Sequence, residues 1–176
     1  MLQRTRAVSV VPVYEKLVRD YPTPADLAEL NESQIARLIA PLGLKWRAPL
    51  IKKLATDLSQ RENVPKGYDV LRELPAIGDY AASAYLSFHG KKRAVIIDAN
   101  VVRWICRFTG APYDGETRRK PWVRAYADAL TPKRAYQAYN YAILDFTMQI
   151  CKARPICSQC PFAYQCKFSL KAGVAS

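Results

Sequence analysis

The apolar residues of this chain recur at every third or fourth position from residue 8 to residue 58, which is the spacing of helices with one buried face. Residues 31–34 read Asn-Glu-Ser-Gln ahead of an apolar run, and this order predicts a capping box at the start of a helix. The only strand candidate is Ala-Val-Ile-Ile at residues 94–97, a run too short for periodicity to separate a strand from a buried connector. Because helical patterns dominate on both sides of it, we expect an all-α fold.

Prolines add further expected helix boundaries. The Thr-Pro pairs at residues 23–24 and 131–132 each place a capping hydroxyl directly ahead of a proline, so each pair is predicted to begin a helix. Pro12 is expected to separate two helices within the first twenty residues, because a proline inside a helix removes a backbone hydrogen bond.

The expected boundary between two lobes lies at the turn Gly-Lys-Lys-Arg, residues 90–93. The chain has 176 residues, half of them hydrophobic, which is enough to bury a core in one compact unit. We therefore expect a first lobe over residues 1–93 and a second over residues 94–176.

Charge and hydropathy narrow the class of partner. Lys and Arg total 27 against 15 Asp and Glu, a formal net charge of +12 that favours a polyanion such as nucleic acid, although solubility is the alternative reason for such an excess. The sequence shows no apolar run of the roughly 20 residues that a membrane-spanning helix needs, and no signal-peptide core follows the first residues. We expect a soluble cytoplasmic protein without a membrane partner, associated with the nucleoid if the source is prokaryotic.

Four of the five cysteines lie within sixteen residues, in the pattern C-x5-C-x2-C-x5-C. Four thiolates can hold either a tetrahedral zinc ion or a 4Fe-4S cluster, and spacing alone does not choose between them. The predicted metal ligands are Cys151, Cys157, Cys160 and Cys166. Cys106, among apolar neighbours, is expected to be a buried core residue.

A tight turn between helices is predicted at Leu-Pro-Ala-Ile-Gly, residues 74–78, with Gly78 able to take a positive φ angle. The helix expected from Asp79 to Phe88 begins with free amides, which, together with those of the turn, suit a phosphate. The pattern fits a sequence-independent grip on a nucleic-acid backbone and also fits a plain helix-helix turn.

This turn, an acidic residue about twenty positions later and the cysteine pattern follow one another in an order that resembles the endonuclease III superfamily of helix-hairpin-helix DNA glycosylases. The resemblance covers essentially the whole chain. Residues 1–5 look like the family's DNA-contacting segment, residues 42–44 like its wedge loop, and residues 140–151 like the helix that leads into its cluster. The resemblance implies a helical barrel lobe with the hairpin and a second lobe with an iron-sulfur cluster.

Asp98 matches the family's catalytic aspartate. The resemblance implies that its carboxylate stabilises positive charge on the deoxyribose as the N-glycosidic bond breaks, or helps activate the nucleophile, and an oxocarbenium-like centre does call for a fixed carboxylate. Asp98 is also a natural N-cap for the next helix, and both roles are compatible because a cap holds the carboxylate rigid.

Tyr80 stands where bifunctional members carry the lysine that forms a Schiff base with the sugar. Tyrosine has no amine for that step, so we expect a monofunctional enzyme that uses water and leaves the abasic site uncut. Together with Asp98-Ala99-Asn100, Tyr80 resembles the glycosylases that remove thymine or uracil mispaired with guanine. The alternative for Tyr80 is a packed helix residue.

The expected partner is double-stranded DNA with a mismatched or damaged base, which leaves the stack before excision. By resemblance Arg4 fills the vacated space, Leu44 wedges beside the orphan guanine, and Pro75, Ile77 and Gly78 contact the DNA backbone. Leu44 in a Gly-Leu turn could instead be a buried anchor.

The cysteine pattern resembles the family's C-x6-C-x2-C-x5-C loop, so the resemblance favours a 4Fe-4S cluster over zinc. The first gap is one residue shorter here, and residues 152–156 are expected to take a tighter path.

Other interpretations stay open at this stage. Excision of adenine or of an oxidised pyrimidine is the nearest alternative within the family. The chain starts within the segment that resembles the DNA-contacting helix, so the family's preceding helix is expected to be absent, and a truncated, non-catalytic DNA-binding module is the alternative of another class. A monomer is the default expectation.

Overall fold

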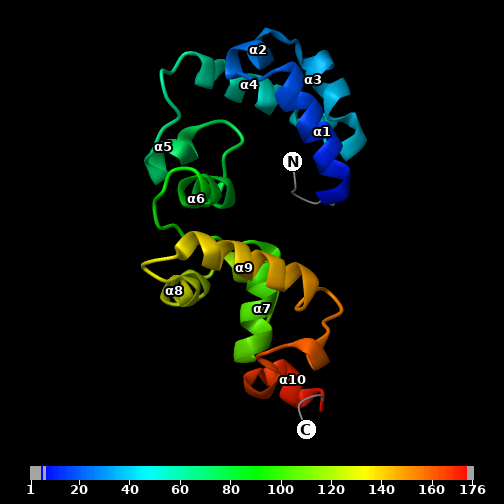
Figure 1. Cartoon of the computed structure of the whole chain (residues 1–176), viewed down its shortest axis with the longest axis vertical. Helices are drawn as coiled ribbons and strands as arrows, with labels where there is room; N and C mark the ends of the chain where they lie inside the picture. The colour runs from blue at the N-terminus through cyan, green and yellow to red at the C-terminus, as the bar shows by residue number, and fades with distance from the viewer. Residues whose placement is uncertain (1–4, 6, 174–176) are drawn as a thin grey trace. The chain divides into compact units, whose positions relative to one another are not determined.

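The computed structural model describes residues 5 and 7–173, and every regular element in that part of the chain is a helix (Figure 1). The all-α prediction is therefore confirmed. Residues 94–97, the strand candidate, form a connector without regular secondary structure between two helices. The described residues include no helix with the length and apolar character needed to span a membrane. The chain divides into two compact units, Met1–Gly78 and Asp79–Ser176.

The first unit packs its core between short helices. The buried side chains of Val10, Val13, Ile35 and Ile39 meet those of the turn between α3 and α4. Helix α4 packs along α2 and α3. The α-helices of this unit are α1 (Ala7–Asp20), α2 (Pro24–Glu29), α3 (Glu32–Leu38), α4 (Ala48–Ser59) and α5 (Tyr68–Glu73), with 3-10 turns at Ala40–Leu42 and Lys45–Arg47.

The second unit is built around α7 (Ala99–Thr109), whose buried residues Val102 and Ile105 pack against Val123 and Ile143 from two other helices. Helix α7 contacts α8, α9 and α10. The other helices of this unit are α6 (Asp79–Phe88), α8 (Pro121–Leu130), α9 (Tyr136–Gln149) and α10 (Lys167–Lys171), with 3-10 turns at Thr117–Arg119, Cys157–Gln159 and Ala163–Gln165.

The predicted helix starts in the first unit are confirmed where the signal is local. Asn31 caps α3 in a capping box with Gln34, and Thr23 caps α2 in a second box ahead of its proline. The prediction for Pro12 is wrong, since Pro12 lies inside α1. Its missing amide removes only one hydrogen bond, to the carbonyl four residues earlier in the first turn, so the rest of the helix continues.

The predicted helix start at residues 131–132 is also wrong. Thr131 ends α8 instead, because its hydroxyl donates to the Ala127 carbonyl at 2.8 Å and its amide closes the last turn. Helix α9 starts only at Tyr136, after Ala135 adopts a left-handed φ of 55°. Here the threonine bonds backward to the helix that precedes it.

The two units divide after Gly78. The sequence predicts a boundary later in the chain, at the turn of residues 90–93. Helix α6 belongs with the second unit because it packs on α9. The Asn140 side chain donates to Ser87 Oγ at 2.8 Å and to the Ala94 carbonyl at 2.9 Å, and Gln137 donates to the Ser87 carbonyl at 2.8 Å. These contacts fix both ends of the turn to α9.

Candidate active site and cysteine pocket

Asp98 is held as the N-cap of α7. Its Oδ1 accepts from the Val101 amide at 2.7 Å, and its Oδ2 accepts from Asn100 Nδ2 at 2.8 Å. The capping role considered from the sequence is therefore confirmed. Because both oxygens are engaged on one side by the start of α7, the carboxylate has a fixed orientation, as an electrostatic stabiliser requires.

Tyr80 lies in the first turn of α6, in the same unit as Asp98, and is 37% exposed. Partial burial, and then the negative charge of Asp98, raise the pKa of the Tyr80 phenol above its ordinary value of 10.0. The two side chains are therefore close enough to interact electrostatically. At neutral pH this arrangement combines a neutral hydroxyl and a carboxylate.

A chain of hydrogen bonds runs from Asp98 toward the cysteine segment. Asn100, which donates to Asp98, accepts from Arg103 Nη1 at 2.9 Å. The Arg103 guanidinium also donates through Nη2 to the carbonyls of Thr147 at 3.0 Å and Cys151 at 2.9 Å. One arginine thus links the carboxylate of α7 to the end of α9, where the first cysteine stands.

The hairpin at residues 74–78 is a tight turn, but the residue with a positive φ angle is not the predicted one. Ala76 has a φ of 63°, whereas Gly78 is not among the described residues with positive φ. A Cβ added at Gly78 would meet nothing within 4 Å, and Gly78 is exposed. Pro75 and Ile77 are half-buried, and the Ile77 amide donates to the Leu74 carbonyl at 3.2 Å.

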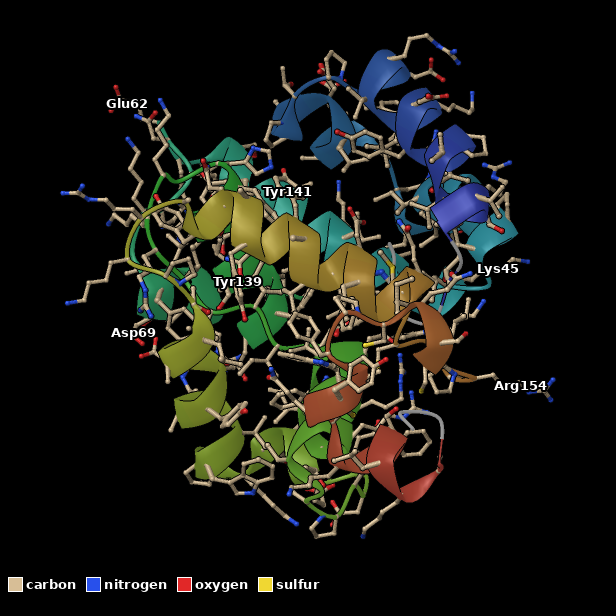
Figure 2. All side chains as sticks on the ribbon, turned by 60° about the horizontal axis from the view of Figure 1, so that its bottom comes forward. Lys45, Glu62, Asp69, Tyr139, Tyr141 and Arg154 are labelled. Atoms are coloured by element: carbon tan, nitrogen blue, oxygen red, sulfur yellow. The ribbon has the colours of Figure 1, made fainter. Side chains whose placement is uncertain are left out.

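In the turn predicted as a wedge loop, the structure matches the second of the two alternatives given for Leu44, a buried anchor. Leu44 is 8% exposed and packs in the core of the first unit, as a buried anchor does. Trp46, two residues later, is 65% exposed, and the Arg47 guanidinium lies over its ring at 4.8 Å from the centroid. Lys45 in the same turn extends outward (Figure 2). Arg4 lies outside the described residues.

The four cysteines line one pocket in the second unit. Burial, and then the sulfurs of Cys166 and Cys151, raise the pKa of the Cys157 thiol. Burial also raises the pKa of the Cys160 thiol. A hydrogen bond from the Phe162 amide partly offsets this increase, and the three other cysteines add to it. The cysteines thus interact with one another across the pocket. Cys106, in α7, is buried in the core cluster of the second unit, as expected, and does not line the pocket.

The short first gap of the cysteine pattern follows a well-defined path. Arg107 donates through Nη1 to the Lys152 carbonyl at 2.7 Å and through Nη2 to the Ala153 carbonyl at 2.8 Å. The Ile156 amide returns to the Ile150 carbonyl at 3.0 Å. Arg154, between these anchors, extends away from the loop into solvent (Figure 2). These bonds close the loop without the residue that the longer pattern has.

Comparison with known families settles what kind of protein carries this site. Residues 1–125 match the model described as HhH-GPD superfamily base excision DNA repair protein. The chain belongs to the HhH-GPD superfamily. The predicted resemblance and the prediction of a DNA N-glycosylase in base excision repair are confirmed.

Relatives within the superfamily carry two kinds of name. A thymine/uracil-DNA glycosylase from Pyrobaculum aerophilum is 37% identical over 170 residues, which cover 92% of this chain and 73% of that protein. An adenine DNA glycosylase from Mycobacterium tuberculosis is 31% identical over 165 residues, which cover 92% of this chain and 54% of that protein. A solved structure of a thermostable thymine-DNA glycosylase matches with a TM-score of 0.88 and 30% identity, over 97% of this chain and 80% of the other.

Sequence reasoning singled out Asp98, Tyr80 and the cysteines, and it missed the side chains that support them. Asn100 was noted only as part of a resemblance, although an amide two residues after an N-cap aspartate is a local signal for this bond. Arg103 bonds Asn100 three residues earlier, but its two carbonyl partners lie 44 and 48 residues away in the sequence and leave no local signal.

Proposed function

We propose that this glycosylase is monofunctional and removes thymine or uracil mispaired with guanine. The observation that carries the proposal is the pairing of Tyr80, a neutral phenol, with the fixed carboxylate of Asp98. The names of two of the similar proteins, a thymine/uracil-DNA glycosylase and a thermostable thymine-DNA glycosylase, support the choice of base.

The proposed chemistry needs one carboxylate and one water. As the bond between C1′ and the base nitrogen breaks, its electron pair leaves with the base and positive charge develops on the sugar. Asp98, held by Val101 and Asn100, stabilises that charge. Water then adds to C1′, and its proton is released to the base or to solvent. Tyr80 cannot form a Schiff base, so the DNA strand stays intact.

DNA contact is proposed for two features of the first unit, the hairpin and Trp46. The hairpin residues Pro75, Ile77 and Gly78 would approach the phosphate backbone, because Gly78 carries no side chain and has open space around it. Trp46 would stack on a base, with cationic neighbours suited to the adjacent phosphates. The net charge of +12 supports duplex DNA as the partner.

The resident group proposed for the cysteine pocket is a 4Fe-4S cluster, which when bound would supply a rigid, redox-capable brace for the loop. Cys151, Cys157, Cys160 and Cys166 would hold it. A zinc ion with bonds of about 2.3 Å would draw its four sulfurs to within about 4 Å of one another. Among the residues the structure describes, no three His, Cys, Asp or Glu side chains are grouped to hold a single ion. The choice of a cluster rests on the spacing of the four cysteines, which resembles the iron-sulfur loop of the family.

The first experiment uses labelled duplexes with one G:T, G:U, A:G or thymine glycol site, each assayed with and without alkali. Strand breaks at G:T or G:U only after alkali are expected. Breaks without alkali would contradict the assignment of Tyr80. Excision of adenine from A:G alone would move the specificity to that of the adenine relative, and no product on any duplex would support a DNA-binding module without activity.

Two variants test the residues themselves. Asp98→Asn should bind the duplex normally and lose excision. Tyr80→Lys should gain strand cleavage without alkali, while the matched variant Tyr85→Lys, on the same helix, should not. Undiminished excision by Asp98→Asn would remove Asp98 from the mechanism.

A further inference from the structure

One buried hydroxyl in the second unit lacks a hydrogen-bond partner. Ser169 in α10 is 1% exposed, and its Oγ is one of two buried side-chain oxygen or nitrogen atoms without a partner among the described residues. A hydroxyl removed from water is costly unless it is hydrogen-bonded. Serine in a helix commonly bonds back to a carbonyl of the preceding turn, and Ser169 does not.

Ser169 lines the same pocket as the four cysteines. It lies three residues after Cys166, so both residues share one face of the helical turn that Cys166 begins. Most other lining residues are apolar, including Trp104, Phe108 and Phe162. The unpartnered hydroxyl therefore belongs to a residue that lines a pocket in which the side-chain acceptors are sulfur atoms.

The charged donor at this pocket, Arg107, is already engaged. Arg107 donates to the carbonyls of Lys152 and Ala153 and approaches Cys151 Sγ at 3.6 Å. Its guanidinium also lies over the Phe168 ring at 4.9 Å from the centroid. Arg107 thus supports the loop near Cys151, and Ser169 is the one hydroxyl among the residues that line the pocket in the described part of the chain.

We propose that the Ser169 hydroxyl donates a hydrogen bond to a sulfur of the iron-sulfur group and thereby sets its reduction potential. This inference rests on the cluster proposed above. A hydrogen bond to sulfur withdraws electron density and stabilises the reduced state, so the donor makes the potential more positive. Ser169 acts through the bound group and takes no part in breaking the glycosidic bond.

The test compares the purified full chain with Ser169→Ala and with the matched control Ser83→Ala, which removes a buried hydroxyl of α6 that does not line the pocket. Iron and sulfide content should be the same in all three proteins. Ser169→Ala should shift the one-electron equilibrium about tenfold toward the oxidised cluster, which corresponds to a potential about 59 mV more negative. Ser83→Ala should leave the potential unchanged, and Ser169→Thr, which keeps the hydroxyl, should retain the wild-type value.

A second measurement detects the hydrogen bond by spectroscopy. In deuterated water, exchange of the Ser169 proton should alter the iron-sulfur stretching bands of the wild-type protein, and this isotope effect should be smaller in Ser169→Ala, where only other donors such as Arg107 remain. A wild-type protein without an exchange-sensitive band would overturn the proposal, as would an unchanged potential in Ser169→Ala or zinc in place of iron. Since these readouts come from the cluster, a protein that carries the cluster but excises no base still tests Ser169.

Discussion

Replacing Asn100 by alanine should slow base excision without weakening DNA binding. Asn100 donates to Asp98 Oδ2 at 2.8 Å, and alanine at this position cannot make that bond. The bond from the Val101 amide to Asp98 Oδ1 remains. The carboxylate would then be held by one bond and free to rotate. Since a carboxylate stabilises the transition state only when it is oriented, the loss should appear in the chemical step.

The size of the effect follows from the type of bond. A hydrogen bond to a charged group contributes about 1.5–3 kcal/mol. If that contribution is realised in the transition state, the excision rate falls by about tenfold to 150-fold, because 1.36 kcal/mol corresponds to tenfold in rate. The dissociation constant for the duplex should stay within about twofold, since phosphate contacts dominate affinity for DNA.

The assay is single-turnover excision with enzyme in excess over labelled duplex, so that product release does not limit the rate. Asn100 also accepts from Arg103, and Asn100→Asp keeps this acceptor while it replaces the donor to Asp98 by a second negative charge. Both variants should be slow if the donor matters. Asn63→Ala, which changes an exposed loop residue, is the matched control. Wild-type rates in both Asn100 variants would refute the reasoning.

Three further predictions follow from other contacts. Because the pKa of Tyr80 is raised in the folded state, the neutral phenol stabilises that state below about pH 10, and this contribution is lost as the pH rises through the raised pKa. The free energies of unfolding of wild type and Tyr80→Phe should therefore change with pH in parallel below about pH 10. Above about pH 10 only the wild type should lose this contribution. Trp46→Ala should weaken duplex binding in fluorescence anisotropy by about 1–3 kcal/mol, the range for one stacked base, whereas Trp122→Ala, in α8, should not. Arg103→Met leaves the carbonyls of Thr147 and Cys151 without this donor, so the melting temperature of the variant should fall. In a double-mutant cycle, Arg103→Met should reduce the excision rate less in the Asn100→Ala background than in wild type, because Arg103 also bonds Asn100.

The parts of the fold that sequence predicted well depend on contacts between near neighbours. The side chains of Asn31 and Asp98 each accept from an amide three residues later, so both partners of the contact lie within one short stretch of sequence. Such a contact can be predicted from that stretch alone. The same logic failed at Thr131, whose hydroxyl had a competing acceptor in the helix behind it. The hydroxyl therefore bonds at the end of α8, and α9 begins only at Tyr136.

Side-chain exposure in turns was harder to predict for a related reason. Leu44 and Trp46 stand two residues apart in a loop, and the sequence gives no period that assigns one to the core. The core of the first unit accepts Leu44 and leaves Trp46 outside. The left-handed residue of the hairpin is likewise Ala76, although glycine adopts that conformation at lower cost.

Helix α7 connects the two functional regions of the second unit. Its N-cap is Asp98, and two arginines one helical turn apart, Arg103 and Arg107, hold the backbone on both sides of the first cysteine. A helix of eleven residues is stiff over that length, so a shift of the cysteine segment would move the helix and its cap together. The cysteine segment can therefore position the carboxylate from a distance without contacting the sugar. This gives a physical reason for the proposed metal-binding loop and the proposed catalytic carboxylate to belong to one compact unit.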